Sequence, residues 1–195
     1  MFYNGDVVRD MLRAISGDTL RDHRDRAIIA IGMGGAFRRS ELVAIDVAHV
    51  ELRDDGIVIF VPVAKADQLG NGATVGIPNG ERIPAVAIYK AWIELAGIVK
   101  DSVFRKLTPQ GRLTQKRMSD RGVALVVKAA AAAAGYTAEK FSGHSLRTGF
   151  LTEAARQGAD PFKMMEHSRH RSLDTMVGYV RDQDRFRNSA VAKVL

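Results

Sequence analysis

The spacing of apolar residues changes twice along this chain, and the two changes determine its fold class. Before Val50, and again from Val86 onward, apolar residues recur every three or four positions, which is the repeat of an amphipathic helix. Between Val50 and Pro78 the period is two, which is the repeat of a strand. The chain is therefore predicted to be α+β and mostly helical, with one small antiparallel three-stranded sheet.

Capping and stop residues mark the ends of most predicted helices. Thr19 and Ser119 stand before helical segments, Gly17 and Gly135 end two of them, and Pro161 suits a first helical turn. The predicted helices are Asp6–Ile15, a segment from Thr19 through Met33, Arg38–Ile45, Val86–Ile98, a segment from Ser119 through Ala134, a segment from His144 or Ser145 to about Gln157, one that begins at Pro161, Asp174–Arg181 and Phe186–Leu195.

Turn residues divide the strand-forming segment into three strands. Val50–Arg53 and Ile57–Val63 are separated by Asp54-Asp55-Gly56, which predicts a hairpin. The polar, glycine-rich segment Ala66–Gly72 then leads into a third strand, Ala73–Pro78.

Composition excludes several classes of protein. The length of 195 residues predicts one domain, 1–195. Cysteine is absent, which excludes disulfides, thiolate catalysis and cysteine-ligated metal centres. The longest apolar runs, such as Ala27–Ile31, are too short to span a bilayer, and the residues after Met1 lack the features of a secretory signal. We therefore expect a cytoplasmic protein without a membrane partner.

The charge balance favours nucleic acid as a partner. Lys and Arg number 29 against 22 Asp and Glu, a formal net charge of +7. Basic residues gather between Arg105 and Arg121, around a predicted turn at Thr108–Gly111, and such clustering is typical of surfaces that bind phosphates. The alternative is a solvated basic face. The candidate DNA-binding residues are Arg105, Lys106, Arg112, Lys116, Arg117 and Arg121.

Six residues that could carry out chemistry occur in a fixed order along the chain. They are Arg38, in Arg38-Arg39-Ser40-Glu41-Leu42; Lys65, beside a predicted hairpin turn; His144 and Arg147, three apart on one helix face; His170; and Tyr179, nine residues further on. Each residue alone has an ordinary structural explanation, such as a surface salt bridge, a solvated turn or core packing. The ordered set as a whole is far more specific.

This set resembles the tyrosine recombinase family, also called phage integrases, over nearly the whole chain. The matches are Arg38–Leu42 to the first box (Gly-x-Arg-x-Ser-Glu-Leu), Lys65 to the β-hairpin lysine, Gly143–Gly149 to the second box (Gly/Leu-His-x-Leu-Arg and small residues), His170 to the third histidine and Tyr179 to the nucleophile. One departure is Arg169, because the family usually has glycine directly before the third histidine.

The resemblance implies that three residues hold the scissile phosphate and that a fourth supports them. Arg38 and Arg147 would clamp its non-bridging oxygens, since guanidinium groups stay charged and bind oxygens in pairs. His170 would donate a further hydrogen bond to the phosphate. Glu41, one helical turn after Arg38, would orient neighbouring groups rather than react.

The resemblance implies that three further residues move protons or electrons. Tyr179 would attack phosphorus, with His144 as its base, because a phenol with a pKa of about 10 is almost entirely protonated at neutral pH. Lys65 would protonate the departing 5′ oxygen. The implied product is a 3′-phosphotyrosyl linkage with a free 5′ hydroxyl, and its formation requires no cofactor. No metal site is expected, because no carboxylate motif accompanies His167 and His170.

The resemblance also bears on domains and partners. It covers residues 1–195 as a catalytic domain, and the family's N-terminal helical domain is expected to be absent. The implied partners are double-stranded DNA and further copies of the chain, as a tetramer on DNA joined through the apolar stripe of Phe186–Leu195. Docking of that segment on its own domain is the alternative.

Three functions remain open at this stage. The first is a site-specific recombinase or its catalytic fragment, the second a non-catalytic DNA-binding modulator of a full-length recombinase, and the third a relaxing enzyme of the type IB topoisomerase kind. The intact set of six residues argues against the second. The small size and the box Gly143–Arg147 argue against the third.

Overall fold

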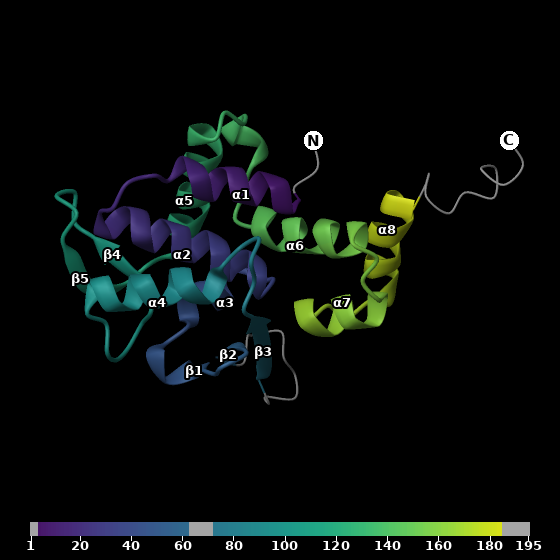
Figure 1. Ribbon diagram of the computed structural model, residues 1–195, viewed down its shortest axis with the longest axis horizontal. Helices are drawn as coiled ribbons and strands as arrows, with labels where there is room; N and C mark the ends of the chain where they lie inside the picture. The colour runs from purple at the N-terminus through teal and green to yellow at the C-terminus, as the bar shows by residue number, and fades with distance from the viewer. Residues whose placement is uncertain (1–3, 63–71, 185–195) are drawn as a thin grey trace, which may run out of the picture.

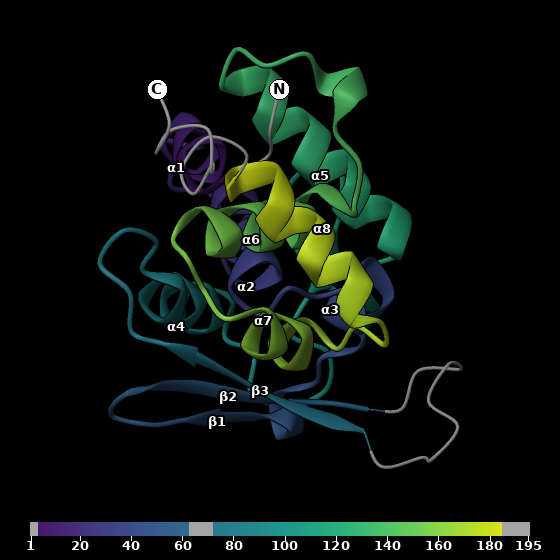
Figure 2. The same ribbon diagram turned by 90° about the vertical axis from the view of Figure 1, so that its right-hand side faces the viewer.

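A buried helix, α2 (Leu20–Gly34), lies at the centre of the fold. The computed structural model describes residues 4–62 and 72–184. Figures 1 and 2 show a sheet along one edge of the molecule, with the helices gathered on one side of it. The other helices are α1 (Gly5–Ala14), α3 (Arg39–Ala44), α4 (Ala85–Ala96), α5 (Asp120–Ala133), α6 (Ser145–Arg156), α7 (Pro161–Ser168) and α8 (Leu173–Asp184), with short 3-10 turns η1 (Val47–His49) and η2 (Ala138–Lys140).

The predicted caps are present at the helix starts. The Thr19 hydroxyl accepts a hydrogen bond from the Asp22 N–H, and the Ser119 hydroxyl accepts one from the Gly122 N–H. Pro161 is the first residue of α7, after Asp160 as the cap. The helices predicted in the described residues are confirmed to within a few residues at each end, while Phe186–Leu195 lies outside those residues.

The three-stranded antiparallel sheet is confirmed, in the order β1 (Val50–Leu52), β2 (Gly56–Val61) and β3 (Ala73–Pro78). Ile57 and Ile59 of β2 pair with Ile77 and Val75 of β3, and all four side chains are buried in the core. Most of the predicted turn, Ala66–Gly72, lies outside the described ranges, and so does Lys65.

A second, two-stranded sheet was not predicted. It consists of β4 (Arg105–Leu107) and β5 (Leu113–Arg117), joined by the expected turn, in which the Gly111 N–H donates to the Thr108 carbonyl at 2.9 Å. One strand is only three residues long and the other is mostly exposed, so neither produces an apolar alternation in the sequence.

The main core surrounds α2, whose residues Ala27–Ile31 are almost completely buried. An added Cβ at Gly32 would lie 2.6 Å from Cδ1 of Leu146, so glycine permits the close approach of α2 to α6. Trp92 of α4 is fully buried in the same core, and its indole N–H donates to the Val103 carbonyl at 3.0 Å. This packing sets the start of α6 beside the end of α2.

A separate, smaller apolar cluster holds the last three helices together. Its buried members are Leu151, Ala155, Met164 and Met176, from α6, α7 and α8. Tyr179 packs against this cluster and is half-buried. Figure 1 shows α7 and α8 at one end of the molecule, away from β4 and β5.

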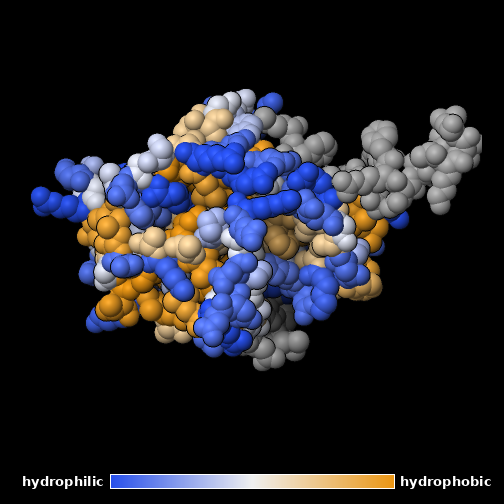
Figure 3. Space-filling view, viewed as in Figure 1, coloured by the Kyte–Doolittle hydropathy of each residue, from blue (hydrophilic) through white to orange (hydrophobic). Residues whose placement is uncertain are grey.

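The surface mixes polar and apolar side chains. Figure 3 shows hydrophilic groups across the middle of one face and apolar groups over α4, where Leu95 is exposed. In the described ranges, 4–62 and 72–184, no helix combines the length and the apolarity needed to cross a bilayer.

One carboxylate joins the first helix to α6. Glu153 accepts a hydrogen bond from the Gly5 N–H at 3.1 Å and two from Arg156, at 2.9 and 2.7 Å. Burial alone would raise the pKa of Glu153, but Arg156, Gln157 and the Gly5 N–H together lower it to about 2. The charged form therefore stabilises the contact between α1 and α6.

We predict that Glu153→Gln lowers the free energy of unfolding by about 2 kcal/mol at pH 7, because the amide keeps the size but loses the charged hydrogen bonds. A carboxylate whose pKa is lowered by folding stabilises above its ordinary value of 4.5, and that contribution is lost as the pH falls toward 2. In urea unfolding, the difference between wild type and variant should shrink across this range. Glu94→Gln, on the exposed side of α4, is the control; an equal, pH-independent loss in both variants would contradict the prediction.

Candidate active site

Arg38 and Glu41 are held together at the start of α3. Arg38 is the residue before the helix, and its backbone N–H donates to Oε2 of Glu41 at 2.8 Å. The Arg38 guanidinium forms an ion pair with Oε1 of the same carboxylate and donates to the Arg169 carbonyl at 3.3 Å. The Arg38 side chain is 39% exposed, whereas that of Glu41 is only 3% exposed. The buried Glu41 carboxylate therefore contacts a guanidinium that reaches solvent, and its supporting role stays a prediction.

Arg147 reaches the same place from α6. An added Cβ at Gly143 would overlap the Arg39 side chain in its present position, so the loop before α6 passes very close to α3 at this glycine. Arg147 is buried, and its Nη1 donates to the Ala36 carbonyl at 2.7 Å. Ala36 has a φ of +47°, which directs the turn between α2 and α3.

His170 lies against Arg147 and follows the end of α7. Its Nδ1 is 3.0 Å from Nη2 of Arg147 and 2.7 Å from Oγ of Ser168. Nε2 lies 3.4 Å from the same Nη2, and because an arginine N–H can only donate, the shorter contact favours Nδ1 as the acceptor and the ring proton of the neutral imidazole on Nε2. This tautomer suits the predicted role, because Nε2–H can donate to a phosphate oxygen.

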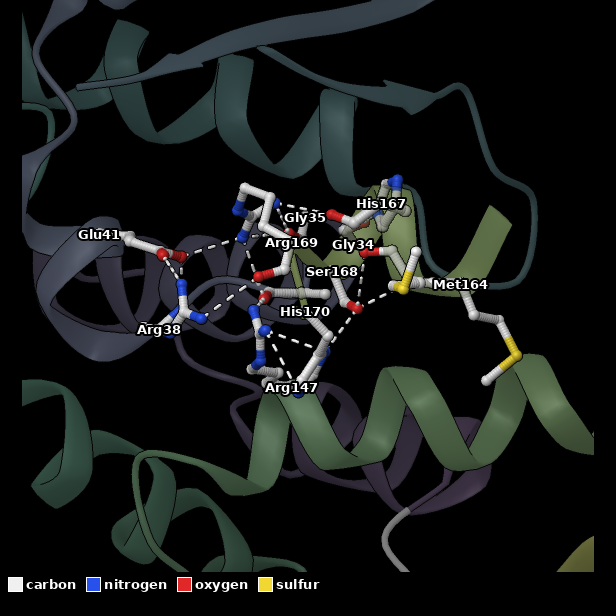
Figure 4. A network of polar contacts seen from close by, with 12 residues as sticks. Gly34, Gly35, Arg38, Glu41, Arg147, Met164, His167, Ser168, Arg169 and His170 are labelled. Carbon is white, nitrogen blue, oxygen red and sulfur yellow. Dashed lines mark hydrogen bonds and ion pairs between the residues drawn. The ribbon is translucent and has the colours of Figure 1, made fainter. Parts of the chain in front are cut away.

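Arg169, noted in the sequence only as a departure from the family pattern, lies at the centre of these contacts (Figure 4). It ends α7 in the left-handed conformation, with φ +57°. Its guanidinium donates to the carbonyls of Gly35, Ala36 and His167 and to Oε2 of Glu41 at 2.7–3.1 Å, and it lies 5.1 Å from the centre of the Phe37 ring. The sequence motifs assigned no role to Arg169. The signal that could have found it was the replacement of the family's usual glycine by arginine at this position.

His167 joins α7 to the end of α2. Its Nε2 is 2.8 Å from the Gly34 carbonyl, and its ring stacks on Phe150 at a centroid distance of 4.6 Å. Burial lowers the pKa of His167, although the Gly34 carbonyl opposes this. Among the residues that the structure describes, no three His, Asp or Glu side chains are grouped to bind a metal ion.

The structure thus brings Arg38, Glu41, Arg147 and His170 together, and two further predicted residues lie on neighbouring elements. His144 stands directly before α6, exposed, one helical turn ahead of Arg147. Tyr179 lies on α8 within electrostatic range of Arg147. The position of Lys65 lies outside the described residues.

The basic stretch is divided between structural and exposed residues. Arg105 is only 5% exposed, and its guanidinium donates to the Ser102 carbonyl at 3.0 Å, to the Lys100 carbonyl and to Gln115, so the fold uses the group predicted to bind phosphate. Arg117 donates to the Val43 carbonyl and to Asp46, both at 2.6 Å, and thereby ties the hairpin of β4 and β5 to the end of α3. Lys106, Arg112, Lys116 and Arg121 are exposed, and so is Arg117 despite these contacts.

Three guanidinium groups around one carboxylate leave a surplus of two positive charges. Burial would raise the pKa of Glu41, but Arg169 and then Arg38 lower it overall. Burial first, and then Arg38, lower the pKa of Arg147 to about 10, against the opposing effects of Glu41 and Tyr179. Burial, followed by Arg147, Arg38 and Arg169, lowers the pKa of His170 to about 4. A site of this charge is built to receive an anion.

Comparison with known proteins agrees with this arrangement. The model of the phage integrase family matches residues 2–185. The chain belongs to the phage integrase family. It is 38% identical, over 173 residues, to the integrase/recombinase xerD homolog of Selenomonas ruminantium, covering 88% of this chain and 51% of that protein. The chain therefore spans about half the length of this relative.

Solved structures share the fold at low sequence identity. The XerH site-specific recombinase bound to palindromic difH substrate has a TM-score of 0.75 at 19% identity, covering 98% of this chain and 52% of that one. The XerA recombinase has a TM-score of 0.72 at 18% identity, covering 97% of this chain and 64% of that one. These likenesses confirm the predicted integrase-type fold.

We predict that His170 stays neutral, with its proton on Nε2, until the pH falls to about 4, whereas an ordinary histidine titrates near 6.5. The reason is that burial and three guanidinium groups oppose a further positive charge. Nitrogen-15 NMR of the imidazole measures both the tautomer and the midpoint. A midpoint near 6.5 would mean that the arginines do not surround this ring in solution.

Proposed function

We propose that this chain is the catalytic domain of a site-specific tyrosine recombinase, which cleaves and rejoins DNA strands through a 3′-phosphotyrosyl intermediate. The observation that carries the proposal is the surplus positive charge around Arg38, Arg147 and His170, with Arg38 open to solvent. A phosphodiester is an anion that repels nucleophiles until its charge is compensated, and these groups compensate it.

In the proposed reaction, Arg38 and Arg147 bind the non-bridging oxygens and Nε2–H of His170 donates to one of them. The Tyr179 oxygen forms a bond to phosphorus and passes its proton to His144. The bond from phosphorus to the 5′ oxygen breaks, and that oxygen takes a proton from Lys65. Reversal of these steps by a 5′ hydroxyl rejoins a strand. The ester keeps the bond energy, so no cofactor takes part.

The matched proteins support a DNA substrate. The XerH structure is named as bound to its difH substrate, and an integrase of the transposon Tn1549, with a TM-score of 0.63, is named as in complex with a circular intermediate DNA. We propose that this chain binds duplex DNA across the site and along the hairpin of β4 and β5. Arg117 attaches this hairpin to the end of α3, and Arg38 stands directly before the same helix.

We further propose that active complexes are homo-oligomers, tetrameric on DNA, joined through Phe186–Leu195. The apolar stripe of that segment supports this, since so short a helix is stable only when docked. The segment lies outside the described residues. A cytoplasmic location belongs to the same proposal.

We predict that Tyr179→Phe abolishes covalent protein–DNA adducts and leaves DNA affinity unchanged, because it removes the attacking oxygen but keeps the ring in its apolar cluster. A pool of nicked duplexes with randomised sequence is incubated with the chain, and adducts that survive denaturant are isolated and sequenced. The nick lets the short strand with the new 5′ hydroxyl diffuse away, which traps the ester.

Tyr136→Phe is the matched control, since Tyr136 bonds to Asp10 at 2.7 Å and has no proposed part in the reaction. Wild type and control should give adducts at one preferred sequence. Binding without adducts in wild type would favour the non-catalytic modulator, and adducts without sequence preference would favour a relaxing enzyme. Undiminished adducts in Tyr179→Phe would contradict its role as nucleophile.

We predict that neutralising Arg112 and Lys116 together makes DNA binding less sensitive to salt. The slope of log affinity against log salt should fall by about one for each phosphate that the protein no longer binds. Fluorescence anisotropy from low to moderate salt measures that slope. The control, Arg13→Gln, removes an exposed cation from α1 and should leave the slope unchanged. Equal slopes in wild type, the control and the double variant would show that the hairpin does not contact DNA.

A further inference from the structure

Arg169 is held in a conformation that suits glycine better. At the end of α7 its φ is +57°, a left-handed conformation that strains a residue other than glycine. Its Nε is buried and has no hydrogen-bond partner in the part of the chain that the structure describes, which is a second unfavourable feature. The contacts of the rest of the guanidinium with Glu41 and with the turn after α2 offset these two unfavourable features, and strain that is retained in this way points to a function.

The guanidinium of Arg169 takes up half of the Glu41 carboxylate. Its Nη2 lies 2.9 Å from Oε2, while Arg38 pairs with Oε1. Because Glu41 is almost completely buried, its charge acts on whichever cations touch it and is screened little by water. With Arg169 present, the charge of Arg38 is only partly cancelled by this carboxylate.

The same guanidinium shares an acceptor with Arg147. The Ala36 carbonyl accepts from Nη1 of Arg147 at 2.7 Å and from Nη2 of Arg169 at 3.1 Å. Figure 4 shows Arg169 between the Glu41 carboxylate and the backbone of the turn after α2. Arg169 thus contacts the partner of each arginine that would bind phosphate, yet its own side chain is only 12% exposed.

We propose that Arg169 is a positioning residue for phosphoryl transfer: it compensates Glu41 so that Arg38 stays available to the scissile phosphate, and it fixes the Ala36 carbonyl that holds Arg147. This inference rests on the proposed function. Without Arg169, the surplus of two positive charges falls to one, and Glu41 is left with Arg38 as its cation. Both carboxylate oxygens then bind Arg38 and draw it away from the phosphate.

The decisive experiment combines Arg169→Gly with Glu41→Gln. Glycine accepts the left-handed backbone, so the single variant should fold, which a melting curve checks. At saturating nicked duplex, its single-turnover rate of adduct formation should fall by about 100-fold, the cost of slight misplacement in a preorganised site. Adding Glu41→Gln removes the uncompensated carboxylate and should restore the rate by about tenfold, an antagonistic coupling between neighbouring residues.

A structural role for Arg169 predicts the opposite coupling. If Arg169 only packs the site together, the double variant is slower than Arg169→Gly, because the second substitution removes further hydrogen bonds. That result would overturn the proposal, as would an undiminished rate in Arg169→Gly. Arg169→Lys, which keeps the charge but cannot reach all four acceptors, should fall between wild type and Arg169→Gly. Arg171→Ala removes a nearby exposed cation and is the control for a general loss of positive charge. Its rate of adduct formation should stay within about twofold of wild type.

A second measurement needs no DNA and separates this inference from the proposed function. Arg169 contributes to the lowered pKa of His170, so Arg169→Gly should raise that pKa above about 4, and Glu41→Gln in the same chain should lower it again. If wild type forms no adduct with any duplex, the proposed function fails while this charge linkage is still tested. If adducts form and the pKa of His170 is the same in all variants, the positioning role of Arg169 fails instead.

Discussion

Three guanidinium groups lie around one buried carboxylate, and the fold supplies what keeps these like charges together. At an effective dielectric constant of about 20, two unit charges about 5 Å apart repel by about 3 kcal/mol, so the cluster needs compensation on every side. Glu41 provides a negative charge, and the carbonyls of Gly35 and Ala36 provide oriented dipoles. Those carbonyls come from the turn that ends α2, whose residues Ala27–Ile31 are almost completely buried. The main core therefore fixes the position of these carbonyl groups, and the carbonyl groups fix the guanidinium groups of Arg147 and Arg169.

Much of the fold could be predicted because its signals are local. Periodicity located the helices of the described residues, and single capping residues such as Thr19 and Ser119 located their starts. The hairpin of β4 and β5 had no such signal, since its side chains are mostly exposed and polar. The burial of Arg105 could not be predicted either. Its partners are backbone carbonyls, so its sequence context does not differ from that of the exposed basic residues around it.

The candidate site divides in the same way. Arg38, Arg147 and His170 could be proposed from motifs, and the structure brings them together. The part played by Arg169 could not be proposed, because most of its acceptors are backbone carbonyls, which every residue has. Only the folded chain shows that an arginine in a position typical of glycine reaches the partners of two other arginines. Departures from a motif are thus as informative as matches once the fold is known.

The division of the interior into two apolar clusters has a consequence for spectroscopy. The chain has a single tryptophan, Trp92, and it is buried in the main core with its indole bonded to Val103. Tyr179 belongs to the other cluster, where four side chains of the described residues are buried. Each such side chain contributes roughly 1–3 kcal/mol, so α8 can separate from its neighbours at far smaller cost than global unfolding. Intrinsic tryptophan emission would remain constant during that separation, and a fluorophore placed on α8 would be required to detect the movement of the helix that carries the proposed nucleophile.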